Sequence, residues 1–441
     1  MNLLKISWKY LVNKPLSTSL NVLLLALGLA MITVLLLIQD QFEKKMNQDA
    51  AGIDLVVGAK GSPLQLILSS VYHLDFPTGN IKMEEAQRLS RNRLVKKVIP
   101  MALGDNYQGY RLVGTNHDYL ELYGVQYAQG ESWEKPFQVT LGADVAEKLQ
   151  LQIGDQFASS HGISVGSHDH EEFKFEVAGI LAPQGKVVDR LILTSIESIW
   201  YSHDEESAEQ ENVMPAESSD SEEAVAQAEP ESHSDEDHQA HTSAKLELPI
   251  AKTGFPPSLE PREVTSLLIQ FRNPMAAIQL PRMINSGTSM QAASPSFEMN
   301  RLFELLGVGI NLLKGIAFVL IVVSGLGIFI ALYNSLKERK YDLAIFRVMG
   351  ASRAQLVMLV FLEGLMLTGF GAVLGIVFGH SFLAILVSFT DQAAVATLDP
   401  WIFLNQELWI IVYALLTGVF ASLIPAWSAY QTSIAKQLTK V

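Results

Sequence analysis

Histidine and carboxylate side chains gather in one part of the sequence, where they could bind a metal ion. Most histidines of the chain fall between residues 161 and 241, among many acidic residues: His161, His168, His170, His203, His233, His238 and His241. Neutral imidazole and carboxylate together suit zinc and similar divalent ions. The candidate metal ligands are His168, His170, His233, His238 and His241. The alternative is a solvated acidic loop in which histidine is incidental, since such tracts bind metal loosely and without fixed geometry.

Other kinds of active-site chemistry are disfavoured by the sequence. The chain has no cysteine, which excludes disulfides, thiolate metal sites and cysteine nucleophiles. "GISVG" at 162–166 has the letters of a nucleophile elbow, but "GSHDHEE" follows where a helix is needed. There is no H-E-x-x-H, and "GAKGSP" at 58–63 lacks the spacing of a nucleotide-binding P-loop. We therefore expect no enzyme, and no ATP hydrolysis by this chain itself.

The net charge of −14 comes mainly from one segment. No lysine or arginine occurs between Arg190 and Lys245, whereas aspartate and glutamate accumulate there. Residues 201–260 lack the apolar side chains needed to fold, and we predict a disordered acidic insertion there. No basic stripe with interleaved aromatic residues exists, so nucleic-acid binding is not expected.

Four long apolar windows indicate a membrane protein. Almost half of the 441 residues are hydrophobic, which is unusual for a soluble protein. The predicted spans are residues 17–39, 305–336, 354–390 and 405–430. Each is long enough to cross about 30 Å of hydrocarbon. A helix is the expected conformation, because lipid offers the backbone no hydrogen-bonding partner.

Lysine and arginine in the short connections set the expected orientation. They cluster in three segments, namely the amphipathic N-terminal segment 1–16, the connection 337–353 and the tail 431–441. Positive loops stay on the cytoplasmic side of a membrane, so both termini are predicted to be cytoplasmic. Residues 40–304 would then be exported across the membrane, together with a short outer loop at 391–404.

The exported region has the pattern of an α+β domain. Strand signals alternate with short helical ones in "GIDLVVGAKG", "MEEAQRLSRN", "GYRLVGT", "QVTLGADVAEKLQLQIGDQF", "FKFEVAGIL", "RLILTSIESIW" and "VTSLLIQFR". The predicted fold class is therefore an α-helical membrane domain of four spans with an inserted α+β periplasmic domain.

The connection 337–353 predicts a short amphipathic helix. Tyr341, Ile345, Val348 and Met349 fall on one arc of a helical wheel, with Lys340, Arg347 and Ala344 nearly opposite. Gly350 is expected to end the helix. Ser352 with Gln355 three residues later predicts a capping box at the start of the third span. An interfacial helix lying on lipid headgroups is the alternative interpretation.

Polar and small residues inside the third span are further candidates. Gly371, Gly375 and Gly379 form overlapping G-x-x-x-G steps that would let another helix approach closely. Glu363 lies near the cytoplasmic end of the span, where we expect it to pair with an interfacial cation rather than handle protons or substrate. His380, deeper in the span, is expected to be a hydrogen-bonded packing residue.

A long stretch around this connection resembles a known family. "ERKYDLAIFRVMGASRAQLVMLVFLEGLMLTGFGAVLGIVFG" is similar to the signature of MacB/FtsX-like ABC transporter permeases, the type VII or mechanotransmission kind that includes LolC and LolE. "VTLGADVAEKLQLQIGDQF" and "FEVAGILAPQGKVVDRLILTSIESIW" resemble their MacB-like periplasmic domain. The order of one span, a large domain and three spans also agrees. The resemblance covers nearly the whole chain outside the insertion 201–260.

The resemblance implies a permease subunit coupled to a cytoplasmic ABC ATPase dimer that binds ATP and Mg²⁺. It further implies a second permease copy forming a homodimer in membrane lipid, and a periplasmic or outer-membrane partner. The segment 337–353 would be the coupling helix, with ATPase contacts at Lys340, Tyr341, Asp342, Leu343, Ile345, Phe346, Arg347, Met349, Gly350 and Arg353. The tail "PAWSAYQTSIAKQL" lacks the second proline and the arginines common in the family. A zinc transport permease and an FtsX-like regulator of a periplasmic partner remain alternatives.

Overall fold

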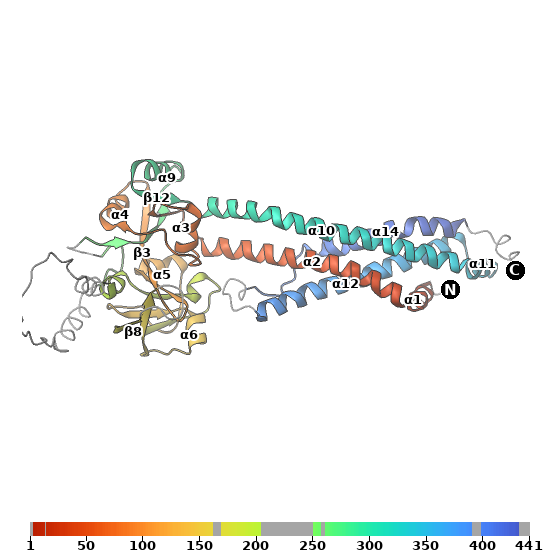
Figure 1. The fold of residues 1–441 in the computed structure, drawn as a ribbon, viewed down its shortest axis with the longest axis horizontal. Helices are drawn as coiled ribbons and strands as arrows, with labels where there is room; N and C mark the ends of the chain where they lie inside the picture. Colours follow the sequence, from red (N-terminus) through yellow and green to blue (C-terminus); the bar gives the residue numbers. More distant parts are fainter. Residues whose placement is uncertain are drawn as a thin grey trace, which may run out of the picture. The chain divides into compact units, whose positions relative to one another are not determined.

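The computed structural model describes residues 3–13, 15–161, 169–203, 250–256, 261–389 and 398–431 (Figure 1). The candidate ligands His168, His233, His238 and His241 lie outside these residues. The chain divides into two compact units. The first unit is Met1–Lys44 with Phe303–Val441, and the second is Lys45–Leu302. Each is described separately below.

The first unit is helical. Four of its helices are long and apolar enough to cross a membrane: α2 (Pro15–Asp49), α10 (Pro295–Glu338), α12 (Arg353–Phe389) and α14 (Glu407–Tyr430). Two shorter helices accompany them, α1 (Leu3–Val12) and α11 (Lys340–Val348). Helices α2 and α10 continue beyond the predicted spans 17–39 and 305–336 and contribute their ends to the second unit.

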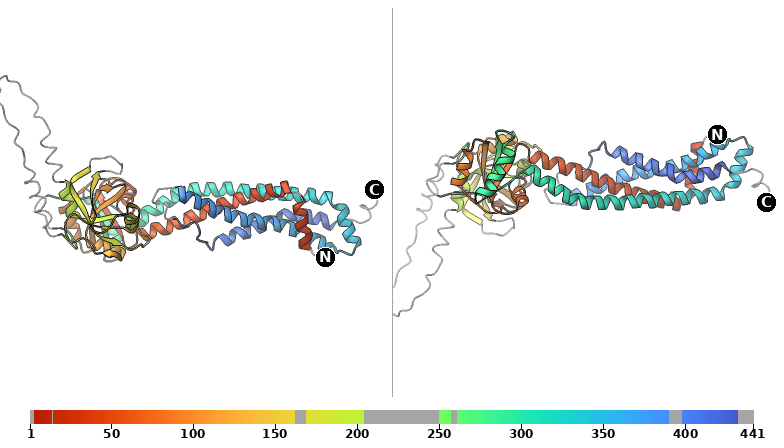
Figure 2. Two further views of the ribbon diagram at one scale, coloured as in Figure 1. Left: turned by 90° about the horizontal axis from the view of Figure 1, so that it is seen from below. Right: turned by 90° about the horizontal axis from the view of Figure 1, so that it is seen from above.

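Small residues let the long helices pack closely in the first unit. Figure 2 shows α2, α10, α12 and α14 side by side. A Cβ atom added at Gly364 of α12 would lie 3.0 Å from the carbonyl oxygen of Gly418 in α14. At Gly28 of α2, an added Cβ would lie 3.2 Å from the Leu320 Cβ of α10. Glycine at these crossings allows the backbones to meet, and such contacts are the main attraction available between helices in lipid.

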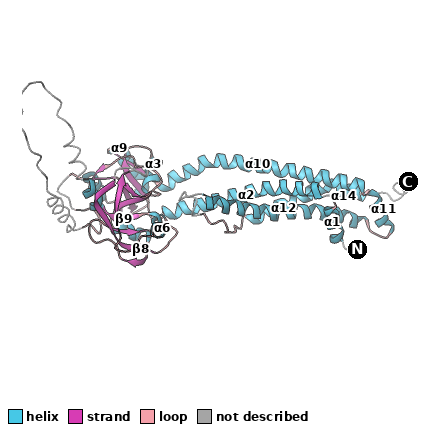
Figure 3. Cartoon of the chain, turned by 60° about the horizontal axis from the view of Figure 1, so that its bottom comes forward, coloured by secondary structure: helices cyan, strands magenta, loops and turns pink. Residues whose placement is uncertain are grey.

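The second unit contains the strands (Figure 3). They are β1 (Leu55–Ala59), β2 (Ile81–Lys82), β3 (Val95–Tyr107), β4 (Tyr110–Thr115), β5 (Tyr127–Gly130), β6 (Gln138–Leu141), β7 (Gln156–His161), β8 (Asp169–Leu181), β9 (Ile192–Ser195), β10 (Glu263–Val264), β11 (Ser266–Phe271) and β12 (Met290–Ala293). The large sheet has the order β12-β1-β11-β3-β4-β9-β6-β8-β5, and β7 pairs with both β3 and β8. Strands β2 and β10 form a separate pair. The pairs β4–β9 and β6–β8 are parallel, which makes the sheet mixed.

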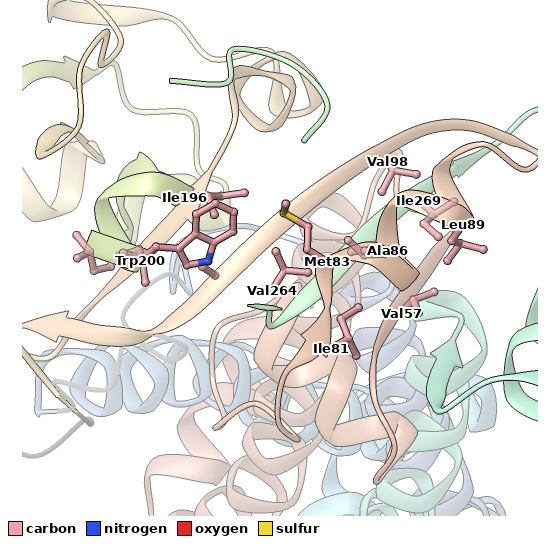
Figure 4. Close-up of a cluster of buried hydrophobic side chains, with 14 of the residues drawn as sticks. Val57, Ile81, Met83, Ala86, Leu89, Val98, Ile196, Trp200, Val264 and Ile269 are labelled. Atoms are coloured by element: carbon pink, nitrogen blue, oxygen red, sulfur yellow. The ribbon is translucent and has the colours of Figure 1, made fainter. Parts of the chain in front are cut away.

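Short helices cover this sheet and close its hydrophobic core. They are α3 (Pro63–Ser70), α4 (Met83–Ser90), α5 (His117–Tyr123), α6 (Ala143–Leu149), α9 (Ala276–Gly287), the 3-10 turn η1 (Val187–Arg190) and a helical stretch at residues 196–203. Figure 4 shows Ala86 and Leu89 of α4 facing Val57, Val98 and Ile269 of the strands. Burial of these side chains is the main stabilising contribution that a domain without disulfides has available.

The predicted fold class is confirmed. Every strand and helix predicted for the exported region is present at its expected sequence, from β1 in "GIDLVVGAKG" to β11 in "VTSLLIQFR". Strands β2, β3, β5 and β12, helices α3, α5 and α9 and the 3-10 turn η1 were not predicted. The predicted disordered insertion 201–260 is too wide at both ends, because residues 201–203 are helical and residues 250–256 hydrogen-bond to Glu197 and His117. Residues 204–249 and 257–260 lie outside the described residues.

Candidate functional site

Helix α11 is a short, separate helix whose C-terminal end is fixed by a tight turn. Gly350 has φ +99°, a left-handed conformation that residues with a Cβ rarely adopt. The Ala351 N–H donates to the Phe346 carbonyl at 2.9 Å, and the Gly350 N–H donates to the Arg347 carbonyl at 3.1 Å. This pair of bonds is a Schellman motif, which satisfies the last carbonyls of the helix. As predicted, Gly350 ends the helix.

The predicted capping box between α11 and α12 is also present. The Ser352 N–H donates to the Gln355 side-chain oxygen at 2.8 Å, and the Gln355 N–H donates to the Ser352 hydroxyl at 3.2 Å. The two bonds satisfy donors that the start of α12 would otherwise leave open. Only Met349 to Ser352 separate α11 from α12, and this connection is held by hydrogen bonds at both ends.

Two faces of α11 differ sharply in exposure. Leu343 and Ala344 are both buried, and Leu343 belongs to a hydrophobic cluster that includes Leu336, Leu356 and Leu359. The opposite face is apolar but exposed: Tyr341 50%, Ile345 37%, Val348 64% and Met349 68%. We call these four residues the α11 face. Leu343, expected at an ATPase contact, instead anchors the helix to its own unit, because its side chain is 3% exposed.

The remaining candidate contacts of this segment have mixed surroundings. Asp342 is exposed, whereas Lys340 and Phe346 are half-buried. Arg347 donates to the Ala351 carbonyl at 3.3 Å, which braces the turn after the helix. Arg353 lies over the ring of Tyr430 in α14, 5.4 Å from its centroid. These two arginines are thus engaged within the chain as well as being near the surface.

Arg339, directly before α11, joins three helices. Its guanidinium donates to Glu363 of α12 at 3.0 Å and to the Ser335 carbonyl of α10 at 3.2 Å. It also lies over the ring of Tyr10 in α1, 3.9 Å from the centroid. A planar, permanently charged guanidinium suits this combination of a carboxylate partner and an aromatic face. The predicted cation partner of Glu363 is therefore Arg339.

The three glycines of the third span meet α2. An added Cβ at Gly371, Gly375 or Gly379 would lie 2.7 Å from a side-chain atom of Leu25, Leu29 or Thr33 respectively. The spacing of four residues places all three on the same side of α12. The structure thus brings the predicted packing residues together along a single helix crossing.

His380 is hydrogen-bonded and buried, as predicted. Its Nδ1 lies 2.6 Å from the Pro400 carbonyl oxygen, and its Nε2 lies 3.0 Å from a carboxylate oxygen of Glu407. Glu407 also accepts a hydrogen bond from the Leu404 N–H at 3.0 Å. The arrangement ties the connection before α14 to α12.

The metal-site prediction mostly falls outside the described chain. Of its five histidines only His170 lies on a described element, strand β8. Within the described residues, no group of three or more histidine or acidic side chains is placed to hold a metal ion. Zinc binding by these histidines stays a prediction.

Sequence reasoning missed Tyr10 and Glu407, and did not assign Arg339 to the site. The partner of Glu363 could be sought among nearby cations, but a sequence pattern does not indicate which of several basic residues turns inward. Tyr10 belongs to a helix more than 300 residues away in the chain. No local signal relates it to Arg339.

Two family descriptions match the chain. Residues 18–231 match the MacB-like periplasmic core domain, and residues 314–434 match the FtsX-like permease C-terminal domain. The second match includes α11, α12 and α14, and hence the α11 face and Arg339 with Glu363.

Two individual proteins are also similar to the chain, one over a short stretch and the other at low sequence identity. An uncharacterized ABC transporter permease of Methanocaldococcus jannaschii is 24% identical over 125 residues. That match covers 28% of this chain and 31% of the relative, so the chain spans less than a third of the relative's length in it. The crystal structure of the extracellular domain of the noncanonic ABC-type transporter YknZ from Gram-positive bacteria matches 55% of this chain and 99% of its own. It has 12% identity and a TM-score of 0.27.

Proposed function

Because the chain belongs to the FtsX/MacB-like family of ABC transporter permeases, we propose that it converts ATP hydrolysis by a partner ATPase into movement of its large extracytoplasmic domain. The family implies an ATPase partner, and the chain itself has no P-loop. The protein is thus a transporter subunit whose energy comes from another polypeptide.

The observation that carries the proposal is the α11 face. Four apolar side chains stand exposed on a helix whose other side is buried and whose ends are fixed. A partner that binds this face can move α10 and α12. Helix α11 follows α10 directly, and Arg339 hydrogen-bonds to both α10 and α12. A stiff, capped element is what transmission of force between subunits requires.

The arrangement in the membrane follows from the charge distribution. We place α11 and both termini in the cytoplasm of a bacterium and the second unit outside the inner membrane. An ATPase dimer presents two equivalent surfaces, which two copies of this chain would occupy in a symmetric homodimer. The second unit would then act on a substrate or partner outside the membrane.

The test is a charge placed on the α11 face. Met349→Asp should abolish the stimulation of ATP hydrolysis that the permease gives its ATPase in a reconstituted complex. A buried, unpaired carboxylate at an apolar interface costs several kcal/mol, of the order of the affinity of a modest contact.

Ser352→Asp is the matched control. It adds the same charge three residues away at an exposed position, and aspartate caps a helix about as well as serine. Stimulation should survive this substitution. Unchanged stimulation in Met349→Asp would reject docking at the α11 face.

A further inference from the structure

The last turn of α2, residues 45–49, lies wholly within the second unit and is held there by buried phenols. The Tyr72 hydroxyl donates to the Met46 carbonyl at 3.1 Å, and the Tyr123 hydroxyl donates to the Asp49 carbonyl at 2.9 Å. Both tyrosines are 2% exposed, so water does not compete for these bonds. The Met46 carbonyl also accepts from the Ala50 N–H at 3.1 Å, so Tyr72 adds a second hydrogen bond to it. The Asp49 carbonyl ends the helix, and Tyr123 supplies a donor that the helix itself does not provide.

The Asp49 side chain is held as well. Its carboxylate accepts a hydrogen bond from the Val187 N–H at 2.8 Å and lies 3.8 Å from the Lys45 ammonium, which also donates to the Gly185 carbonyl. A carboxylate at the C-terminal end of a helix is unfavourable with respect to the helix dipole. Asp49 is nevertheless 1% exposed, so its position depends on these partners.

The contacts come from three separate segments of the second unit. Tyr72 follows α3, Tyr123 is the last residue of α5, and Val187 begins η1. Two of these segments also touch one another, since the Lys186 ammonium donates to the Tyr123 carbonyl. A displacement of the last turn of α2 therefore acts on α3, α5 and η1 together.

We infer that Tyr72, Tyr123 and Asp49 are positioning residues that attach the second unit to α2, so that movement of this helix reaches α3, α5 and η1 as one body. The inference rests on the proposed function, which supplies the movement. It assigns the attachment to side-chain contacts rather than to the chain connection at 50–54 alone.

The first experiment removes the two hydroxyls and keeps the rings. The complex of the Tyr72→Phe/Tyr123→Phe chain with its co-purified ATPase is compared with the parent complex by hydrogen exchange, with and without ATP. Exchange at the amides of residues 46–50 should rise about tenfold. The ATP-dependent change in exchange at residues 117–123 and 182–190 should fall at least about threefold, while ATP hydrolysis stays within about twofold of the parent.

Tyr127→Phe is the control, because Tyr127 is exposed in the same unit and its hydroxyl interacts with Ser132 rather than with α2. It should match the parent in every readout. An undiminished ATP-dependent change in the double variant would overturn the inference. A parent complex that shows no ATP-dependent change in the second unit would instead overturn the proposed function, and this inference with it.

A disulfide in place of the lost hydrogen bonds distinguishes a second unit that is detached from α2 from one that is unfolded. The chain has no cysteine, so Asp49→Cys/Val187→Cys introduces a single thiol pair, at two residues joined by the hydrogen bond from the Val187 N–H to the Asp49 carboxylate. Added to the double phenylalanine variant, the disulfide should restore the ATP-dependent change, and reductant should abolish it again. A quantitatively formed disulfide that restores nothing would also overturn the inference.

Discussion

Arg339 and Glu363 are the residues on which the placement of α11 depends most directly. Their side chains are 18% and 5% exposed, so this is a largely buried ion pair. Such a pair contributes little net stability compared with apolar residues, but removing one partner leaves the other charge uncompensated. The pair therefore fixes where α11 begins more than it strengthens the bundle.

We expect Glu363→Gln to destabilise the first unit by about 3 kcal/mol, because the guanidinium of Arg339 stays buried without its carboxylate. Thermal unfolding of the full chain in detergent measures this. Arg339→Met/Glu363→Met should recover most of the loss, since it buries no charge. A double variant as unstable as the single one would contradict this account.

We predict that the second unit loses stability in acid because of His73. Its Nε2 lies 3.2 Å from the Tyr119 hydroxyl, and burial lowers the pKa of its imidazole from 6.5 to about 3. Between these pH values the unfolded chain binds a proton that the folded chain does not. The free energy of unfolding should therefore fall as the pH drops below 6.5, by about 2 kcal/mol at pH 5.

His73→Asn tests this contribution. Asparagine does not titrate, and it tolerates the left-handed backbone of this position, where φ is +55°. The unfolding temperature of the variant should depend less on pH between 6.5 and 5 than that of the parent. Equal slopes would show that another group causes the acid sensitivity.

Among the elements, α12 packs closely on both α2 and α14 through glycines. At Gly375 an added Cβ would lie 2.7 Å from the Leu29 Cβ and 3.0 Å from the Ala26 carbonyl oxygen. At Gly369, six residues earlier, nothing lies within 4 Å. Replacing glycine with alanine at each position therefore separates the effect of helix propensity on stability from the effect of contact between α12 and α2.

Gly375→Ala should lower the unfolding temperature of the chain in detergent, by an amount corresponding to about 1–3 kcal/mol of overpacking. Gly369→Ala should leave it unchanged or raise it, since alanine favours a helix by about 1 kcal/mol over glycine. Equal effects of the two substitutions would argue against close contact between α12 and α2.

The sequence pattern predicted α11 well because its determinants are local. Gly350, Ser352 and Gln355 act within a few residues of one another, and their hydrogen bonds formed as expected. The orientation of the helix was harder to predict. Leu343 and Ile345 are both apolar, and packing in the cluster formed with α10, α12 and α14 decides that Leu343 faces inward.

At the scale of the whole molecule, the proposed orientation in the membrane can be tested with single cysteines, because the native chain has none. Glu84→Cys on α4 and Asp342→Cys on α11 are both exposed positions. A membrane-impermeant maleimide should label Glu84→Cys in intact spheroplasts, but Asp342→Cys only after permeabilisation. Labelling of both without permeabilisation would rule out a cytoplasmic α11.

The fold class was accessible from the sequence, whereas the order of the strands was not. Spans are recognised by length and apolar composition alone. Strand β3 was missed because "VKKVIPMALGDNY" does not alternate and contains a proline, although it pairs with β11, β4 and β7. The pairing of β3 with β11 joins residues more than 150 positions apart, and it is decided by the tertiary structure.

The pairing of β1 with β12 brings together the places where the chain enters and leaves the second unit. Strand β1 follows α2, strand β12 precedes α10, and the two run antiparallel with Val56 opposite Ala293. A domain whose ends are neighbours can be exchanged as a cassette without redesigning its host. The same helices and α11 could therefore serve different outer domains in evolution, and a foreign domain with adjacent ends is a reasonable graft for engineering.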